Sequence, residues 1–231
     1  MKERIYSIPL TDALKENCGC ALCSIEKKLE QDAAEYFLGP SLMEPDGRAV
    51  TNAKGFCKRH IKMLYDKGNR LGLALMLETH TKHLDVLLQP QKKEGLFKKP
   101  DKNISKELLD AAHGCALCDK LYSQMKDAAE NFVYLFDSET DFKALFKRSG
   151  GLCLSHAALV LKEAPGEFGG KKLDRFNEAF LAFEREKFGK LYENLHEFTL
   201  SFDYRNTKKE LSQEAKNSVD EALISLCKFT D

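Results

Sequence analysis

Eight cysteine and histidine residues occur in a pattern typical of metal-binding proteins. The pattern is CxxC followed by CxxH, and the 231-residue chain contains it twice. The gap between the two motifs is 33 residues in the first repeat and 34 in the second. Zinc prefers thiolate and imidazole ligands in a tetrahedron, and two intervening residues let one turn of backbone present both side chains to one ion. The candidate ligands are Cys20, Cys23, Cys57, His60, Cys115, Cys118, Cys153 and His156.

This pattern predicts two zinc ions per chain, each held by three cysteines and one histidine. Each repeat contains a full set of four ligands, so we expect one site within each repeat. Exchange of ligands between the repeats is the alternative that spacing alone leaves open. Because protein side chains fill all four positions, no position remains for a substrate or a reactive water, and the sites are predicted to be structural.

Other roles for these thiols remain open. Buried cysteines pack as small hydrophobic residues, but this does not explain paired spacing or histidines that repeat with the cysteines. The CxxC pairs at helix N-termini are also compatible with thiol–disulfide chemistry, or with a metal or redox sensor. Iron–sulfur proteins more often supply four cysteines.

One position two residues before each CxxC also carries a possible ligand. It is Cys18 in the first repeat and His113 in the second. These residues are either a fifth ligand or a coincidence at a helix end, and we favour coincidence. Cys227 has no partner at ligand spacing and is predicted to pack in the last helix.

A second motif, Glu193-Asn194-Leu195-His196, resembles the ExxH of di-iron helical bundles. Such sites need a second ExxH and two further glutamates, and the first repeat offers only His80 and His83. We therefore interpret the motif as a solvated helix face.

The two halves of the chain share further sequence besides the ligands. Asp-Ala-Ala-Glu follows each CxxC, at 32–35 and at 127–130, and a Gly-x-Cys-x-x-His block completes each half. Offsets of 95 and 96 residues across three blocks in the same order indicate internal duplication. Helical periodicity, with no alternating strand pattern of useful length, predicts an all-α fold.

We divide the chain into two tandem helical repeats and a final helix. The first repeat covers 1–90, a lysine-rich linker bounded by prolines covers 91–104, the second repeat covers 105–206 and the last segment covers 207–231. The last helix is expected to pack on the repeats through one apolar stripe. Its members are Leu211, Ala215, Val219, Ala222 and Leu226.

Composition excludes several classes of protein. Lys+Arg and Asp+Glu both number 36, so the net charge is zero and nucleic acid is not expected as a partner. No apolar run is long enough for a signal peptide or a membrane span, which predicts a cytoplasmic protein whose thiols stay reduced. No glycine-rich phosphate loop, serine nucleophile elbow or HExxH is present, so an enzyme is disfavoured.

Three segments also resemble an uncharacterised bacterial family known as a domain of unknown function. They are the run 51–60 (TNAKGFCKRH), the run 151–156 (GLCLSH) and the run 202–206 (FDYRN) before the last helix. Ser155 stands where that family leads us to expect proline, which leaves the ligands intact. The resemblance covers nearly the whole chain and implies a bacterial cytoplasmic protein without an assigned activity. We predict that Asp203-Tyr204-Arg205 makes a buried polar contact with a repeat.

These observations together predict a zinc-binding helical protein with a binding or scaffolding role. A protein partner is possible, although its identity is not encoded in any motif that we recognise. The alternative is a thiol–disulfide redox protein or a metal or redox sensor that uses the CxxC pairs.

Overall fold

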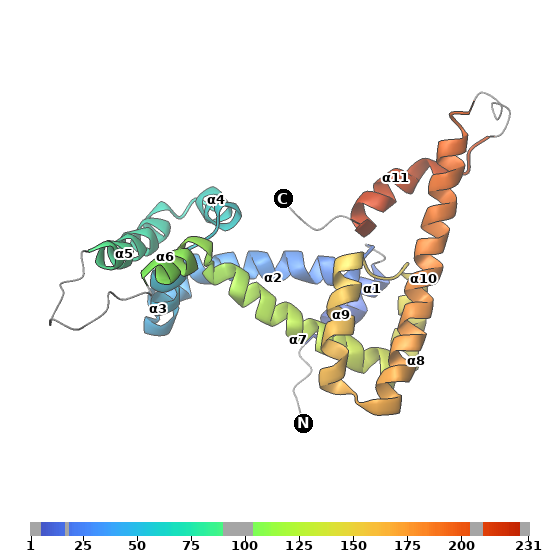
Figure 1. Ribbon diagram of the computed structural model, residues 1–231, viewed down its shortest axis with the longest axis horizontal. Coiled ribbons are helices and arrows are strands. Elements are labelled where there is room, and N and C mark those ends of the chain that lie inside the picture. The colour runs from blue at the N-terminus through green and yellow to red at the C-terminus, as the bar shows by residue number, and fades with distance from the viewer. Residues whose placement is uncertain (1–5, 17–18, 90–103, 204–209, 227–231) are drawn as a thin grey trace. The chain divides into compact units, whose positions relative to one another are not determined.

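A computed structural model describes residues 6–16, 19–89, 104–203 and 210–226 (Figure 1). Every regular element in these ranges is helical, so the all-α prediction is confirmed. The first half contains α1 (Ser7–Lys15), α2 (Ala21–Leu38), a 3-10 turn η1 (Pro40–Leu42), α3 (Pro45–Lys54), α4 (Lys58–Asp66) and α5 (Arg70–Leu88). The second half contains α6 (Ile104–His113), α7 (Ala116–Ser138), α8 (Thr140–Arg148), α9 (Leu154–Glu167), α10 (Gly170–Leu200) and α11 (Gln213–Leu226).

The helices form two compact units that differ from the tandem division predicted from sequence. One unit contains residues 1–27 together with 124–231, and the other contains residues 28–123. The boundaries fall within α2 and α7, so these two long helices each contribute residues to both units. We call residues 1–27 and 124–231 the split unit, and residues 28–123 the inserted unit. The predicted linker lies almost wholly outside the described residues, which resume at 104.

Phenylalanine rings make up the core of the split unit. Phe132 on α7 contacts Phe146 on α8 edge to face, with ring centroids 5.1 Å apart, and it also contacts Phe180 on α10. All three side chains are fully buried. Aromatic pairs in this geometry contribute about 0.5–1.5 kcal/mol beyond the burial of their area. Phe176, Phe180 and Leu191 are buried on one side of α10.

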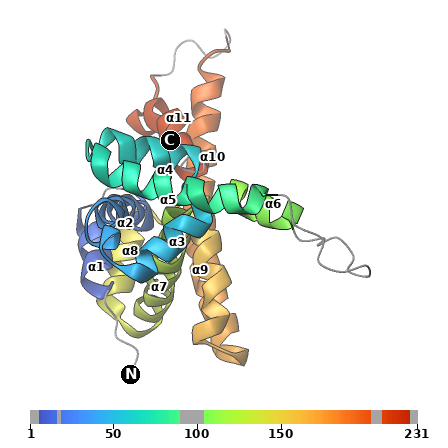
Figure 2. The ribbon, with the colours of Figure 1, turned by 90° about the vertical axis from the view of Figure 1, so that its left-hand side faces the viewer.

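Aliphatic side chains dominate the core of the inserted unit. Leu38 of α2, Leu64 of α4 and Met76 of α5 pack in one cluster, which Cys115 and Leu117 at the start of α7 join. Helices α3, α5 and α6 contact one another in this unit, and Figure 2 shows them together. The core therefore reaches the CxxC of the second repeat directly.

The connection between α2 and α4 in the first repeat contains a helix. Pro45 opens α3 at its first position, where a missing N–H costs nothing because that donor lies outside the helical hydrogen-bond ladder. The corresponding connection of the second repeat contains α8.

The stripe predicted for the last helix is wrong in part. Val219 and Leu226 are 42% and 50% exposed, whereas Ser218 and Ser225 are buried with Ala215. Small residues occupy the buried face of α11 because they allow it to lie close to α10, the helix that it contacts most (Figure 1). The buried Ser218 hydroxyl donates to the Ala215 carbonyl at 2.8 Å, so its burial leaves no donor unpaired.

No helix among the described residues combines the length and the apolar character needed to cross a bilayer. Tyr204, Arg205 and Cys227 lie outside the described residues, as does Cys18.

Candidate metal centres

The structure gathers the eight predicted ligands into two clusters of four. One cluster, which we call centre A, contains Cys20, Cys23, Cys153 and His156. The other, which we call centre B, contains Cys57, His60, Cys115 and Cys118. Within each cluster the candidate ligand atoms all lie within 4.8 Å of one another.

The predicted grouping of ligands within each repeat is therefore wrong. Each centre takes its CxxC from one repeat and its CxxH from the other. Centre A lies in the split unit and centre B lies in the inserted unit, so every ligand of a centre belongs to the same unit. Spacing fixed the pairs within each motif correctly but did not determine which two motifs meet.

Helix N-termini position all four ligand pairs. Cys57 and Cys153 are the N-caps of α4 and α9, with extended backbone dihedrals, and each histidine follows in the first helical turn. Cys20 and Cys115 immediately precede α2 and α7. The unpaired N–H groups at a helix start carry partial positive charge and stabilise thiolates there. The Cys118 amide, for example, lies 3.4 Å from the Cys115 sulfur.

The histidine Nδ1 atom faces the three sulfur atoms in both centres. In centre A the distances from His156 Nδ1 are 3.4 Å to Cys20, 3.2 Å to Cys23 and 3.2 Å to Cys153. The Cys23 and Cys153 sulfur atoms are 3.6 Å apart.

Centre B repeats this arrangement. The His60 Nδ1 atom lies 3.3 Å from Cys57, 3.2 Å from Cys115 and 3.2 Å from Cys118. The Cys57 and Cys118 sulfur atoms are 3.9 Å apart.

These distances fit a tetrahedral metal ion. Zinc–sulfur bonds of about 2.3 Å and zinc–nitrogen bonds of about 2.0–2.1 Å put the ligands of a tetrahedron about 3.8 Å apart for two sulfurs and about 3.5 Å apart for sulfur and nitrogen. The observed separations lie close to both values. Disulfides are not formed, because all six of these cysteines are free.

Carboxylates on α2 lie beside the second ring nitrogen, Nε2, of both imidazoles. Glu30 accepts from His60 Nε2 at 2.9 Å and also pairs with Arg59 at 2.9 Å. Glu26 lies 3.4 Å from His156 Nε2. A carboxylate on the second ring nitrogen fixes the tautomer that presents Nδ1 to the metal and strengthens the nitrogen as a ligand. We did not identify Glu26 or Glu30 from the sequence, and the unusual burial of Glu30, which is 8% exposed, is the clearest sign of its role.

The protonation of the metal-free centres follows from these contacts. Burial opposes a charge on His156, but hydrogen bonds with Cys153, Cys20 and Glu26 prevail and raise its pKa to about 11. The pKa of His60 is raised for the same reasons, through Cys115 and Glu30. Burial likewise opposes the Cys115 thiolate, but hydrogen bonds with His60 and with backbone amides lower the pKa of that thiol to about 6. A metal ion bound at either centre would therefore replace protons in a site already arranged for charge.

A glycine with positive φ shapes the turn before each CxxH. Gly55 has φ +57° and Gly151 has φ +81°, a region that other residues rarely adopt. A Cβ atom on Gly55 would approach His80 to 2.5 Å, and one on Gly151 would approach the Glu184 carboxylate to 3.1 Å. The Gly55 carbonyl also accepts from the Ala116 amide at 3.0 Å, which ties the CxxH turn of centre B to its CxxC.

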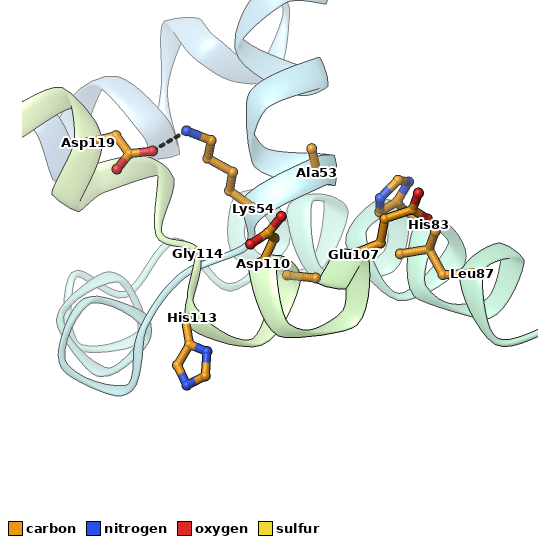
Figure 3. A pocket seen from close by; sticks show the side chains of 10 residues that line it. Ala53, Lys54, His83, Leu87, Glu107, Asp110, His113, Gly114 and Asp119 are labelled. Carbon is orange, nitrogen blue, oxygen red and sulfur yellow. Dashed lines mark hydrogen bonds and ion pairs between the residues drawn. The ribbon is translucent and has the colours of Figure 1, made fainter. Parts of the chain in front are cut away.

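The other candidate ligands that the structure describes lie outside both clusters. His113 is exposed and contacts the Leu109 carbonyl at 3.1 Å through Nδ1, and Figure 3 shows it pointing away from Asp119 and Lys54. His196 is exposed and stacks on Tyr192, which agrees with a solvated helix face.

Comparison with known proteins places the sequence but not its activity. A profile of a family of unknown function (DUF6062) matches residues 1–230. No curated protein and no solved structure gives a match.

Proposed function

The chain belongs to the DUF6062 family of unknown function, and from its two centres we propose that it is a zinc-binding helical protein whose metal ions are structural. The observation that supports this proposal is the geometry of the two clusters, in which three sulfurs and one Nδ1 surround a point at tetrahedral spacing. Soft thiolates select zinc over magnesium or calcium, and a Cys3His set is typical of structural zinc.

The location of the ligands supports a structural role. Centre A joins helices α2 and α9, whose ligands Cys20 and His156 are 136 residues apart. Centre B joins α4 and α7, whose ligands Cys57 and Cys118 are 61 residues apart. Closing loops of this length costs conformational entropy, and metal bonds offset that cost. We propose that each ion holds its own unit together.

We propose a binding or scaffolding role rather than an enzymatic one. Both centres have four protein ligands, which leaves no open position for a reacting group. The free thiols suit a compartment that keeps cysteine reduced, so we retain the cytoplasm as the proposed location.

Elemental analysis of protein purified without oxygen tests the proposal. We expect two zinc ions per chain and six protected thiols that become reactive only after metal removal. Stripping the metal with a chelator should lower the melting temperature and the helix content by circular dichroism, because metal binding contributes folding free energy. Metal-free protein that melts at the same temperature as zinc-loaded protein would contradict a structural role.

A further inference from the structure

The two centres differ in how far solvent reaches their sulfur atoms. In centre A, Cys20 and Cys153 are buried and Cys23 is half-buried. In centre B only Cys115 is buried, Cys57 is half-buried and Cys118 is exposed. Cys23 and Cys118 occupy the same position in their CxxC motifs, so the difference comes from the surroundings and not from the motif.

In the part of the chain that the structure describes, a helix that follows the second repeat lies beside centre A. Asn217, Asp220 and Ile224 of α11 line the same pocket, of about 370 Å³, as Cys20 and Cys153, so α11 faces these two ligands across the pocket. The described part of the first repeat contains no helix that corresponds to α11.

Centre B also has a pocket beside it. This pocket, of about 580 Å³, is lined by Gly114 and Asp119, the residues that flank the CxxC of centre B (Figure 3). Lys54 pairs with Asp119 across it. Cys118, which precedes Asp119, is itself exposed, so small molecules in water reach this residue.

Within centre B, Cys57 is the sulfur placed to react with Cys118. Their sulfur atoms are 3.9 Å apart, and both side chains are at least partly exposed. Cys115 is buried, and its sulfur accepts a hydrogen bond from the Cys118 amide at 3.4 Å, which holds that sulfur in place. A Cys57–Cys118 bond links the start of α4 to the start of α7.

We propose that centre B is an oxidation site, at which a hydroperoxide converts Cys118 and Cys57 to a disulfide and releases zinc while centre A keeps its ion. This inference rests on the zinc-binding function proposed above and adds a regulated difference between its two sites. Thiolate reactivity toward oxidants follows exposure, which is the property that separates the two centres.

The reaction balances with hydrogen peroxide as the oxidant. The Cys118 thiolate attacks one peroxide oxygen, the O–O bond breaks and hydroxide leaves, which gives a sulfenic acid. The Cys57 thiolate then attacks that sulfur, forms the S–S bond and expels a second hydroxide. Each hydroxide takes up a proton to form water. Two sulfurs lose the two electrons that peroxide gains, zinc keeps its charge, and only Cys115 and His60 remain as ligands.

Zinc release under limiting hydrogen peroxide tests this proposal on the full chain. The Cys18→Ser/Cys227→Ser background removes the two other thiols and keeps all eight candidate ligands. We expect one zinc per chain to reach a colorimetric indicator about tenfold faster than the other. Peptide mass spectrometry should then find Cys57 joined to Cys118, and reductant with zinc should restore the second ion.

Matched substitutions assign the fast step. Cys118→His replaces the thiol with another zinc ligand that does not form a disulfide, and it should abolish the fast release. Cys23→His makes the same change at the corresponding position of centre A and should leave the fast release unaltered. If Cys118→His fails to bind the second ion, the disulfide mapped in the background protein decides whether Cys118 and Cys57 are the residues that are oxidised.

The outcomes separate this inference from the proposed function. Protein that contains no zinc before oxidation overturns the proposed function. Protein with two zinc ions that leave at equal rates, that leave first from centre A, or that leave with a Cys115–Cys118 bond overturns the inference and leaves the zinc-binding function intact.

Discussion

Pairs of cysteine substitutions test the exchange of ligands between the repeats. Cys23→Ser/Cys153→Ser removes two thiolates from centre A and none from centre B. Cys23→Ser/Cys57→Ser also removes two thiolates, but it takes one from each centre. The first protein should keep one tightly bound zinc, and the second should keep none.

The expected size of the effect follows from the energy of metal binding. Structural zinc sites contribute about 10–16 kcal/mol, so each of four ligands accounts for about 2.5–4 kcal/mol. Loss of one thiolate then weakens zinc binding by about 100–1,000-fold. Dialysis against a chelator of intermediate affinity should strip the weakened centres and leave an intact one filled.

Inductively coupled plasma mass spectrometry gives the zinc content of each dialysed protein. A second pair of variants serves as a matched control: Cys57→Ser/Cys115→Ser should keep one zinc, and Cys115→Ser/Cys153→Ser should keep none. Circular dichroism confirms that each variant retains helix. Sites formed within each repeat require the reverse pattern, with one zinc in Cys23→Ser/Cys57→Ser and none in Cys23→Ser/Cys153→Ser. That result would refute the exchanged geometry.

Three further predictions concern the surroundings of the ligands. Glu30→Gln should weaken zinc binding at centre B by about 10–100-fold in a competition titration, because the buried carboxylate orients His60. Glu26→Gln should have a smaller effect at centre A, because Glu26 is more exposed and lies farther from its histidine. Equal effects of the two substitutions would contradict this role. Zinc binding at pH 7 should release protons to an indicator dye in weak buffer, and the apparent affinity for zinc should fall as pH is lowered. The reason is that the raised pKa of His156, about 11, keeps its imidazole protonated in the metal-free protein. Zinc binding without proton release would show that the imidazoles are neutral. Gly55→Ala should destabilise the protein by about 1–3 kcal/mol in urea unfolding, because alanine disfavours φ +57° and its Cβ would meet His80. Gly166→Ala is the matched control, because no atom lies within 4 Å of the added Cβ there.

The sequence was sufficient to predict the cysteine and histidine pairs of both clusters because their proximity depends on short-range spacing. A CxxC or CxxH places both side chains at one helix start wherever that helix lies, so each pair was predictable. Which pair meets which depends on the paths of α2 and α7, each of which carries residues of both units, and local periodicity contains no information on this.

Two other features were hidden for related reasons. Glu30 reaches His60 from 30 positions away, and a glutamate on a helix gives no sign of its partner. The buried face of α11 was assigned to Val219 and Leu226, since apolar character was the only guide available. The fit of α11 to its neighbour favoured serine and alanine, whose small size matters only once the neighbouring helix is known.

The exchanged ligands also impose an order on assembly during synthesis. The last ligand of centre B is Cys118, so that centre is complete in sequence before any ligand of the second CxxH has been made. Cys23 belongs to the first CxxC to be translated, yet it must wait 133 residues for His156. At about 5–20 residues per second, that wait lasts about 7–27 s. During this time the first CxxC is a free dithiol on a nascent chain. The CxxH nearest to it in sequence, Cys57 and His60, belongs to centre B.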